Sequence, residues 1–186
     1  MKLILGSKSP RRSELLRSLG VEFTVRTKET DESFPSILPS EQVAEFVALK
    51  KANELKSDLL DDEFILCADT VVIIDDQILG KPADREAAIK MLQQLSGREH
   101  RVITGVVIAS LEKQLIFSVT TSVFFHPLSL DEITNYIDQY KPFDKAGSYG
   151  IQEWIGYAAI QRIEGSYNNV VGLPTHEVYQ ALKEFY

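Results

Sequence analysis

Short apolar runs, some uninterrupted and some with a period of two, predict the strands of this chain. The predicted strands are residues 2–5, 64–68, 71–74, 102–109, 117–125 and 157–163. Only Asp69-Thr70 separates the second strand from the third, which predicts either a turn between them or a carboxylate at a strand end. The long neighbouring strands between 102 and 126 imply antiparallel pairing.

Apolar residues spaced three and four positions apart predict helices between these strands. The helices start at turn or capping signals, which are Ser9-Pro10, Pro39-Ser40, Asp84, Ser129 and Pro174-Thr175. Ser129 and Glu132 form a capping box, and Gly20 and Gly97 follow the first and third helices. Strands that alternate with helices, with some antiparallel neighbours, predict a mixed α/β fold.

Composition adds limits on domain number and on partners. The 186 residues contain no linker-like stretch and no repeat, which favours a single domain over residues 1–186. One cysteine and no secretory leader favour the cytoplasm. No apolar run reaches the roughly 20 residues of a membrane-spanning helix. The net charge of −7 argues against a nucleic acid polymer as partner and leaves room for a local basic pocket that binds a small anion.

The segment Ser7-Lys8-Ser9-Pro10-Arg11-Arg12 is a candidate for that pocket. Ser9 and Pro10 are ordinary helix-start residues. Arg11 and Arg12, however, fall in the first helical turn, where the helix dipole disfavours cations. A phosphate or carboxylate bound there would compensate, and the alternative is a solvated, charged turn. The pattern of a Walker A loop is absent.

Asp69 is a second candidate, because a carboxylate within an apolar run needs a partner. It is either a turn residue or a metal ligand and general base. Cys67 shares its strand face and is predicted to fill core space rather than to act as a nucleophile. Lys81, in Gly80-Lys81-Pro82, is by pattern alone a surface charge.

Six short motifs together resemble those of the Maf nucleotide pyrophosphatases. In order, they are Ser7-x-Ser9-Pro10-Arg11-Arg12, Ala68-Asp69-Thr70, Lys81-Pro82, Leu95-Ser96-Gly97-x-x-His100, Asp144-Lys145-Ala146-Gly147-x-Tyr149-Gly150-Ile151-Gln152, and Gly165-Ser166-Tyr167 through Val171-Gly172-Leu173-Pro174. The resemblance implies an α/β fold like that of inosine triphosphate pyrophosphatases, with a mixed sheet, flanking helices and a central cleft. It also implies hydrolysis of nucleoside triphosphates to the monophosphate and pyrophosphate with a divalent metal, Mg²⁺ or Mn²⁺. A homodimer is a further implication.

The resemblance further narrows the substrate and implies roles for individual residues. Ala68-Asp69-Thr70 and Tyr149 to Gln152 resemble the subgroup that acts on dTTP and UTP, with Arg11, Thr70 and Gln152 as its specificity positions. A glutamine amide suits the donor and acceptor edge of uracil or thymine. By the same resemblance, Ser7, Arg12, Lys51 and Lys81 hold the triphosphate, Glu32 and Asp69 hold the metal, and Asp69 is the general base.

Four assignments have alternatives at the level of the sequence. Lys50 is a neighbouring alternative to Lys51, and the segment around Glu32 departs from the commoner acidic pattern of the family. His100 and Asp144-Lys145 either support the site or form caps and ion pairs of the fold. The alternative functions are a nucleotide-binding regulator of cell division and septum formation that works without turnover, and a phosphate-binding metabolic domain that does not discriminate between bases.

Overall fold

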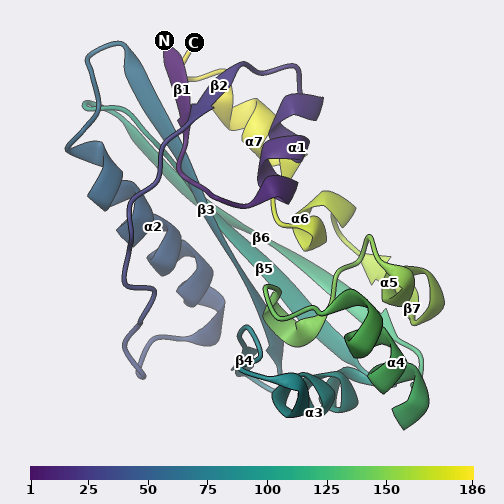
Figure 1. Cartoon of the computed structure of the whole chain (residues 1–186). Coiled ribbons are helices and arrows are strands. Elements are labelled where there is room, and N and C mark those ends of the chain that lie inside the picture. The colour runs from purple at the N-terminus through teal and green to yellow at the C-terminus, as the bar shows by residue number, and fades with distance from the viewer. The chain divides into compact units, whose positions relative to one another are not determined.

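The computed structural model describes all 186 residues, and the chain divides into two compact units (Figure 1). Unit 1 comprises Met1–Thr70, Thr104–Val119 and Gly172–Tyr186, and unit 2 comprises Val71–Ile103 and Thr120–Val171. Three long strands have residues in both units: β3 (Glu63–Ile74), β5 (Glu99–Ala109) and β6 (Gln114–Phe125). The single-domain organisation stays a prediction.

Seven strands form one mixed sheet, which confirms the predicted α/β class. The short strands are β1 (Lys2–Leu5), β2 (Phe23–Val25), β4 (Gln77–Leu79) and β7 (Ile160–Glu164). The strand order is β2-β1-β3-β5-β6-β7, and β4 pairs with β3. β1 runs parallel to β2 and β3, whereas β4 is antiparallel to β3 and β7 is antiparallel to β6.

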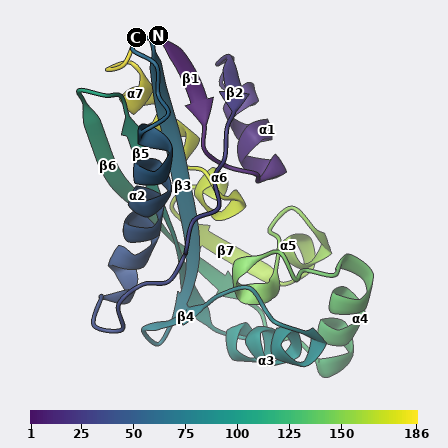
Figure 2. The same ribbon diagram turned by 60° about the vertical axis from the view of Figure 1, so that its left-hand side comes forward.

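In unit 1, helices cover both faces of the parallel strands. Helices α1 (Pro10–Ser18) and α7 (Thr175–Leu182) lie on one face (Figures 1 and 2). Helix α2 (Val43–Lys56), which follows the 3-10 turn η1 (Ser40–Gln42), lies on the other. The first face buries Leu3, Leu5, Phe64, Leu66, Leu16, Val178 and Leu182, and the second buries Ile4, Ile65, Cys67, Ala48, Ala52 and Leu55. Alternate residues of β1 and β3 therefore face opposite cores, as the strand period requires.

The N-terminal end of α2 touches the backbone of β5 directly. A Cβ atom on Gly105 would lie 2.3 Å from the amide nitrogen of Glu45 and 2.4 Å from the carbonyl carbon of Ala44. Both are backbone atoms, which cannot move aside as a flexible side chain can. Gly105 is thus required for the close packing of α2 on the sheet.

In unit 2, four helices and a 3-10 turn accompany strand segments. They are α3 (Arg85–Leu95), α4 (Leu130–Tyr140), η2 (Ala146–Ser148), α5 (Trp154–Ala158) and α6 (Tyr167–Val171). α3 packs beside α4 (Figure 1). The predicted helix starts are confirmed: Asp84 caps α3 by accepting a 2.8 Å hydrogen bond from the amide of Ala87, and Ser129 with Glu132 forms the capping box of α4.

Two sequence predictions are wrong. Asp69-Thr70 does not interrupt a strand, because β3 is continuous from Glu63 to Ile74 and both polar side chains have partners within unit 1. The strand predicted over 157–163 begins only at Ile160, since its first residues close α5, where the amide of Ala159 donates to the carbonyl of Ile155. A short run containing alanines is compatible with either element. No helix combines the length and the hydropathy that crossing a membrane would require.

Candidate functional site

The turn between β1 and α1 gathers hydroxyl groups around an arginine. Ser9 is the N-cap of α1, Pro10 is its first residue, and no acidic residue lies in the first turn. The Oγ atom of Ser7 accepts a 3.2 Å hydrogen bond from the amide of Ser9 and a 3.4 Å bond from Nη1 of Arg12. The predicted helix start is confirmed, and the turn also orients the Arg12 side chain.

Arg12 is a partly buried cation whose hydrogen-bond acceptors are all neutral. Its Nε atom donates to the carbonyl of Gly172 at 2.8 Å, and its Nη2 atom donates to Oγ1 of Thr70 at 3.0 Å. Burial lowers the pKa of Arg12, and the negative charge of Asp69 partly offsets this. A guanidinium stays protonated in proteins, so it carries its charge into this environment. The interpretation of the turn as solvated is therefore wrong for Arg12, and an anion is its natural further partner.

Two carboxylates converge on the ammonium group of Lys51, which α2 supplies. Oδ1 of Asp69 and Oε1 of Glu32 each lie 2.7 Å from Lys51 Nζ. Asp69 and Lys51 are largely buried, with 17% and 16% of their side chains exposed, whereas Glu32 is about half exposed at 52%. The pair of carboxylates is a suitable set of oxygen ligands for a hard divalent cation that keeps waters and phosphate oxygens as its other ligands. No group of three or more His, Cys, Asp or Glu side chains suited to a metal occurs.

The neighbouring lysine has a different environment. Nζ of Lys50 lies 3.0 Å from Oδ2 of Asp31 and 3.0 Å from the carbonyl oxygen of Ser33. It thus fastens the loop that carries Glu32 rather than contacting Asp69. Of the two lysines, Lys51 is the one that the structure places against the candidate carboxylates.

Asp69 and Thr70 are consecutive residues of β3, so their side chains leave the sheet on opposite faces. Asp69 meets Lys51 on the α2 face, and Thr70 meets Arg12 on the α1 face. Both lie beyond the part of β3 that pairs with β1, which ends at Leu66. The cluster therefore lies past the carboxyl end of β1, with helix α1 on one face of the sheet and helix α2 on the other. Such switch points are the usual ligand sites of open α/β sheets.

Cys67 shares the Asp69 face and is fully buried. Burial raises the pKa of the Cys67 thiol to about 12. A thiol of this kind is a poor nucleophile. Its contacts with the core of α2 agree with the prediction that it fills space.

Three predicted binding residues remain. Arg11 lies in the first turn of α1 and is half-buried, whereas Lys81 and Gln152 belong to unit 2 and are exposed. His100 is buried there, with Nε2 2.8 Å from Oη of Tyr149, and burial lowers its pKa to about 3. It is thus a neutral internal hydrogen-bonding group. Lys145 and Asp144 belong to an ion-pair group of the fold. Nζ of Lys145 lies 2.7 Å from Oδ1 of Asp144 and 3.1 Å from Oε1 of Glu153.

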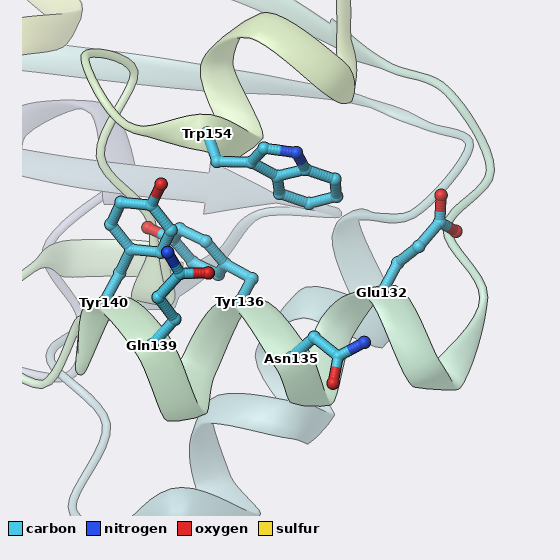
Figure 3. Close-up of a pocket in the computed structure, with 6 residues that line it drawn as sticks. All are labelled: Glu132, Asn135, Tyr136, Gln139, Tyr140 and Trp154. Atoms are coloured by element: carbon cyan, nitrogen blue, oxygen red, sulfur yellow. The ribbon is translucent and has the colours of Figure 1, made fainter.

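A cavity of about 250 Å³ in unit 2 is lined by α4 side chains and by Trp154 (Figure 3). The lining residues are Glu132, Asn135, Tyr136, Gln139, Tyr140 and Trp154. None of them was a candidate site residue. The indole of Trp154 lies across the cavity from the α4 side chains (Figure 3).

Sequence reasoning missed several supporting groups. Oγ1 of Thr104 lies 2.9 Å from Oγ1 of Thr70, and Thr104 has no exposed surface. A hydroxyl in the buried run 102–109 needs a partner, so that pattern was a usable signal. The carbonyl of Gly172 and the hydroxyl of Tyr136 could not be found in the same way, because nothing in the sequence shows which distant group they face.

Comparison with known proteins places the chain in a family. The sequence profile described as Maf-like protein matches residues 2–185. The chain belongs to the Maf family. Among its Maf relatives is a protein of Porphyromonas gingivalis named dTTP/UTP pyrophosphatase, which is 50% identical over 187 residues covering 99% of this chain and 94% of the relative. A Flavobacterium psychrophilum protein of the same name is 49% identical and covers 96% of this chain and 91% of the relative.

Solved structures share the fold of this Maf chain at low sequence identity. The Staphylococcus aureus Ham1 protein aligns with a TM-score of 0.56 and 14% identity over 99% of this chain and 98% of that one. A Ham1 protein from Coxiella burnetii aligns with a TM-score of 0.52 and 14% identity over 99% of each chain. These alignments confirm the predicted fold class.

Proposed function

We propose that this Maf chain is a nucleoside triphosphate pyrophosphatase that hydrolyses dTTP and UTP to the monophosphate and pyrophosphate. Relatives with about half of their residues in common carry that name and cover nearly the whole chain. The structural observation that carries the proposal is a pair of cations, from two different helices, that contact consecutive residues of β3. Lys51 of α2 contacts Asp69, and Arg12 of α1 contacts Thr70.

The proposed roles follow from charge and hydrogen-bonding capacity. Cations offset the charge of a triphosphate and of the pyrophosphate that leaves. We assign triphosphate binding to Ser7, Arg12, Lys51 and Lys81. We assign recognition of the base to Gln152, with Arg11 and Thr70 as further specificity positions.

Asp69 is the proposed general base. Its carboxylate accepts a proton from water while the water oxygen forms a bond to the α-phosphorus. The bond from that phosphorus to the oxygen bridging to the β-phosphate breaks, and pyrophosphate leaves with the electron pair. Asp69 and Glu32 would hold the divalent metal, since both already direct an oxygen at one cation, Lys51. When bound, the metal supplies Lewis-acid polarisation of the phosphoryl oxygens.

The chain is proposed to act as one catalytic domain in the cytoplasm. A septum regulator without turnover has no support from the relatives, whose name is that of a catalyst. A phosphate-binding domain that ignores the base predicts equal use of all nucleotides. The rates on different nucleotides therefore distinguish this alternative from the proposed function.

The deciding experiment is a pyrophosphate-release assay on the purified chain. Common nucleoside triphosphates and 7-methyl-GTP are compared, each with Mg²⁺, with Mn²⁺ and with chelator. We expect release from dTTP and UTP above all others and only with metal. Absence of release from both would overturn the proposal, and equal rates on every base would favour the non-discriminating alternative.

A further inference from the structure

The segment that carries Gln152 is held in place by side chains from other parts of unit 2. Gln152 itself is exposed, whereas its neighbours Tyr149 and Ile151 are buried. The hydroxyl of Tyr149 lies 2.8 Å from Nε2 of the buried His100. Gln152 is thus a free polar group on an anchored backbone.

Tyr136 of α4 contacts this segment on both sides of Gln152, at the backbone of Gly150 and at the side chain of Glu153. Its hydroxyl oxygen accepts a 3.0 Å hydrogen bond from the amide of Gly150 and donates to Oε2 of Glu153. The other carboxylate oxygen of Glu153 lies 3.1 Å from Nζ of Lys145. Both oxygens of Glu153 are therefore engaged, and one phenol links two positions that flank Gln152.

Glycine at position 150 is what allows the Glu153 carboxylate to approach so closely. A Cβ atom at this position would lie 2.9 Å from Cδ and 3.0 Å from Oε1 of Glu153. The segment just before it is strained: Ser148 has a φ of 63°, and its buried Oγ atom has no hydrogen-bond partner. Such conformations persist only where surrounding contacts over-determine them, and they concentrate at functional sites.

We infer that Tyr136 and Glu153 are positioning residues, which fix the Gln152 backbone and thereby set nucleobase selectivity. The inference rests on the proposed role of Gln152. A single amide can recognise the edge of a base only if its position is held within about 0.5 Å, and its orientation within about 10–20°, of the productive geometry. The hydrogen bonds of Tyr136 supply that constraint without touching the base.

The test is Tyr136→Phe, which keeps the ring packed beside Tyr140 and Trp154 but removes both hydrogen bonds. We expect KM for dTTP to rise about tenfold, a change equivalent to the loss of one to two hydrogen bonds. We expect kcat to change little and the preference for dTTP over CTP to fall by a similar factor. A purely structural role would instead lower the amount of folded enzyme and leave KM and base preference unchanged.

Matched variants separate the hydrogen bonds from general effects of mutation. Tyr140→Phe removes a hydroxyl that lies one turn further along α4 and makes no hydrogen bond. This variant should have the KM and base preference of the unmodified chain. Glu153→Gln keeps an acceptor for Tyr136 and should retain most of the selectivity, whereas Glu153→Ala should resemble Tyr136→Phe. Glu153→Ala also takes the place of Tyr136→Phe if the latter does not fold.

Hydrogen exchange of the Gly150 amide gives a readout independent of activity. It should accelerate in Tyr136→Phe and not in Tyr140→Phe. Unchanged base preference in both Tyr136→Phe and Glu153→Ala, with accelerated exchange, would overturn the positioning role alone. Absence of pyrophosphate release by the unmodified chain would overturn the proposed function, and the positioning role with it.

Discussion

In unit 1 the candidate site centres on charged side chains paired across elements, whereas in unit 2 phenol, imidazole and amide groups, with one ion pair between Glu153 and Lys145, hold the segment around Gln152. Lys51 contacts two carboxylates, and Arg12 carries its charge among neutral oxygens. His100 and Tyr149, by contrast, meet as neutral groups inside an aromatic cluster with Phe125. Charges attract a polyanion over several ångströms, while neutral hydrogen bonds act only at contact and depend on orientation.

This difference suggests that the charged groups of unit 1 bind the triphosphate, whereas the Gln152 segment of unit 2 recognises the base. Variants of the charged groups Arg12, Lys51 and Asp69 of unit 1 should therefore alter turnover or affinity for every nucleotide alike. Variants of the groups that hold the Gln152 segment in unit 2 should alter the choice between nucleotides, or the stability of the fold, with less effect on the chemical step.

The largest effect is expected from Asp69→Asn. The amide has nearly the same shape but cannot accept the proton of the attacking water, so kcat should fall by about 10³-fold. Pyrophosphate release from saturating dTTP and UTP measures it. Asp62→Asn is the control, because Asp62 forms an exposed ion pair with Lys2 in the same unit. If Asp69→Asn turned over dTTP at the control rate, another group would have to be the base.

Arg12→Lys should raise KM about a hundredfold for dTTP and UTP equally, because lysine keeps the charge but loses the planar set of donors. Those donors now reach Gly172, Ser7 and Thr70. Arg17→Lys, at the exposed end of the same helix, should leave KM unchanged. Steady-state kinetics with both nucleotides measure the effect. A change confined to one base would mean that Arg12 also contributes to recognition in unit 1.

Much of the local structure could be predicted from the sequence. Capping residues act on amides within three or four positions, so Ser9, Asp84 and Ser129 mark helix starts wherever the chain goes. The strand around Asp69 was mispredicted because the partner of its carboxylate, Lys51, lies 18 residues earlier in the chain. A local sequence pattern indicates that a buried polar side chain needs a partner, but it does not identify that partner.

The same distinction applies to the candidate site. Arg12 could be singled out because a cation in a first helical turn conflicts with the helix dipole. Its contact with Gly172 joins residues 160 positions apart, and a backbone carbonyl leaves no trace in the sequence. The spacing of Tyr136 with Ile133 and Ile137 likewise predicts a buried position on α4, which describes its ring but not its hydroxyl. Polar tips of mainly apolar side chains are where sequence patterns carry the least information.

Gln152→Glu tests the recognition role assigned to unit 2. A carboxylate can accept from the exocyclic amine of cytosine but cannot donate to O4 of thymine or uracil. The preference for dTTP over CTP should fall about tenfold, whereas kcat with the best substrate should stay within a small factor. Gln161→Glu adds the same charge on exposed β7 and serves as the control. Competition between dTTP and CTP measures the ratio, and an unaltered ratio would remove Gln152 from base recognition.

The smallest effect concerns His100, where the neutral network of unit 2 should make stability depend on pH. Burial lowers the pKa of His100 from 6.5 to about 3. Below the ordinary value, the unfolded chain therefore binds a proton that the folded chain excludes, and stability falls as pH falls. Between about pH 7 and about pH 5.5 the free energy of unfolding should fall by about 1 kcal/mol because of His100. This range separates His100 from the carboxylates, which titrate mainly at lower pH.

Urea unfolding at the two pH values measures this loss, and His100→Gln supplies the comparison, because its neutral side chain does not titrate. The absolute stability of the variant is irrelevant to the test. What matters is the difference between the two pH values, which should shrink in His100→Gln. An equal pH dependence in both proteins would assign the effect to other groups. A smaller pH dependence in Asp69→Asn than in His100→Gln would place the pH-sensitive groups in unit 1 and contradict the division between charged and neutral regions.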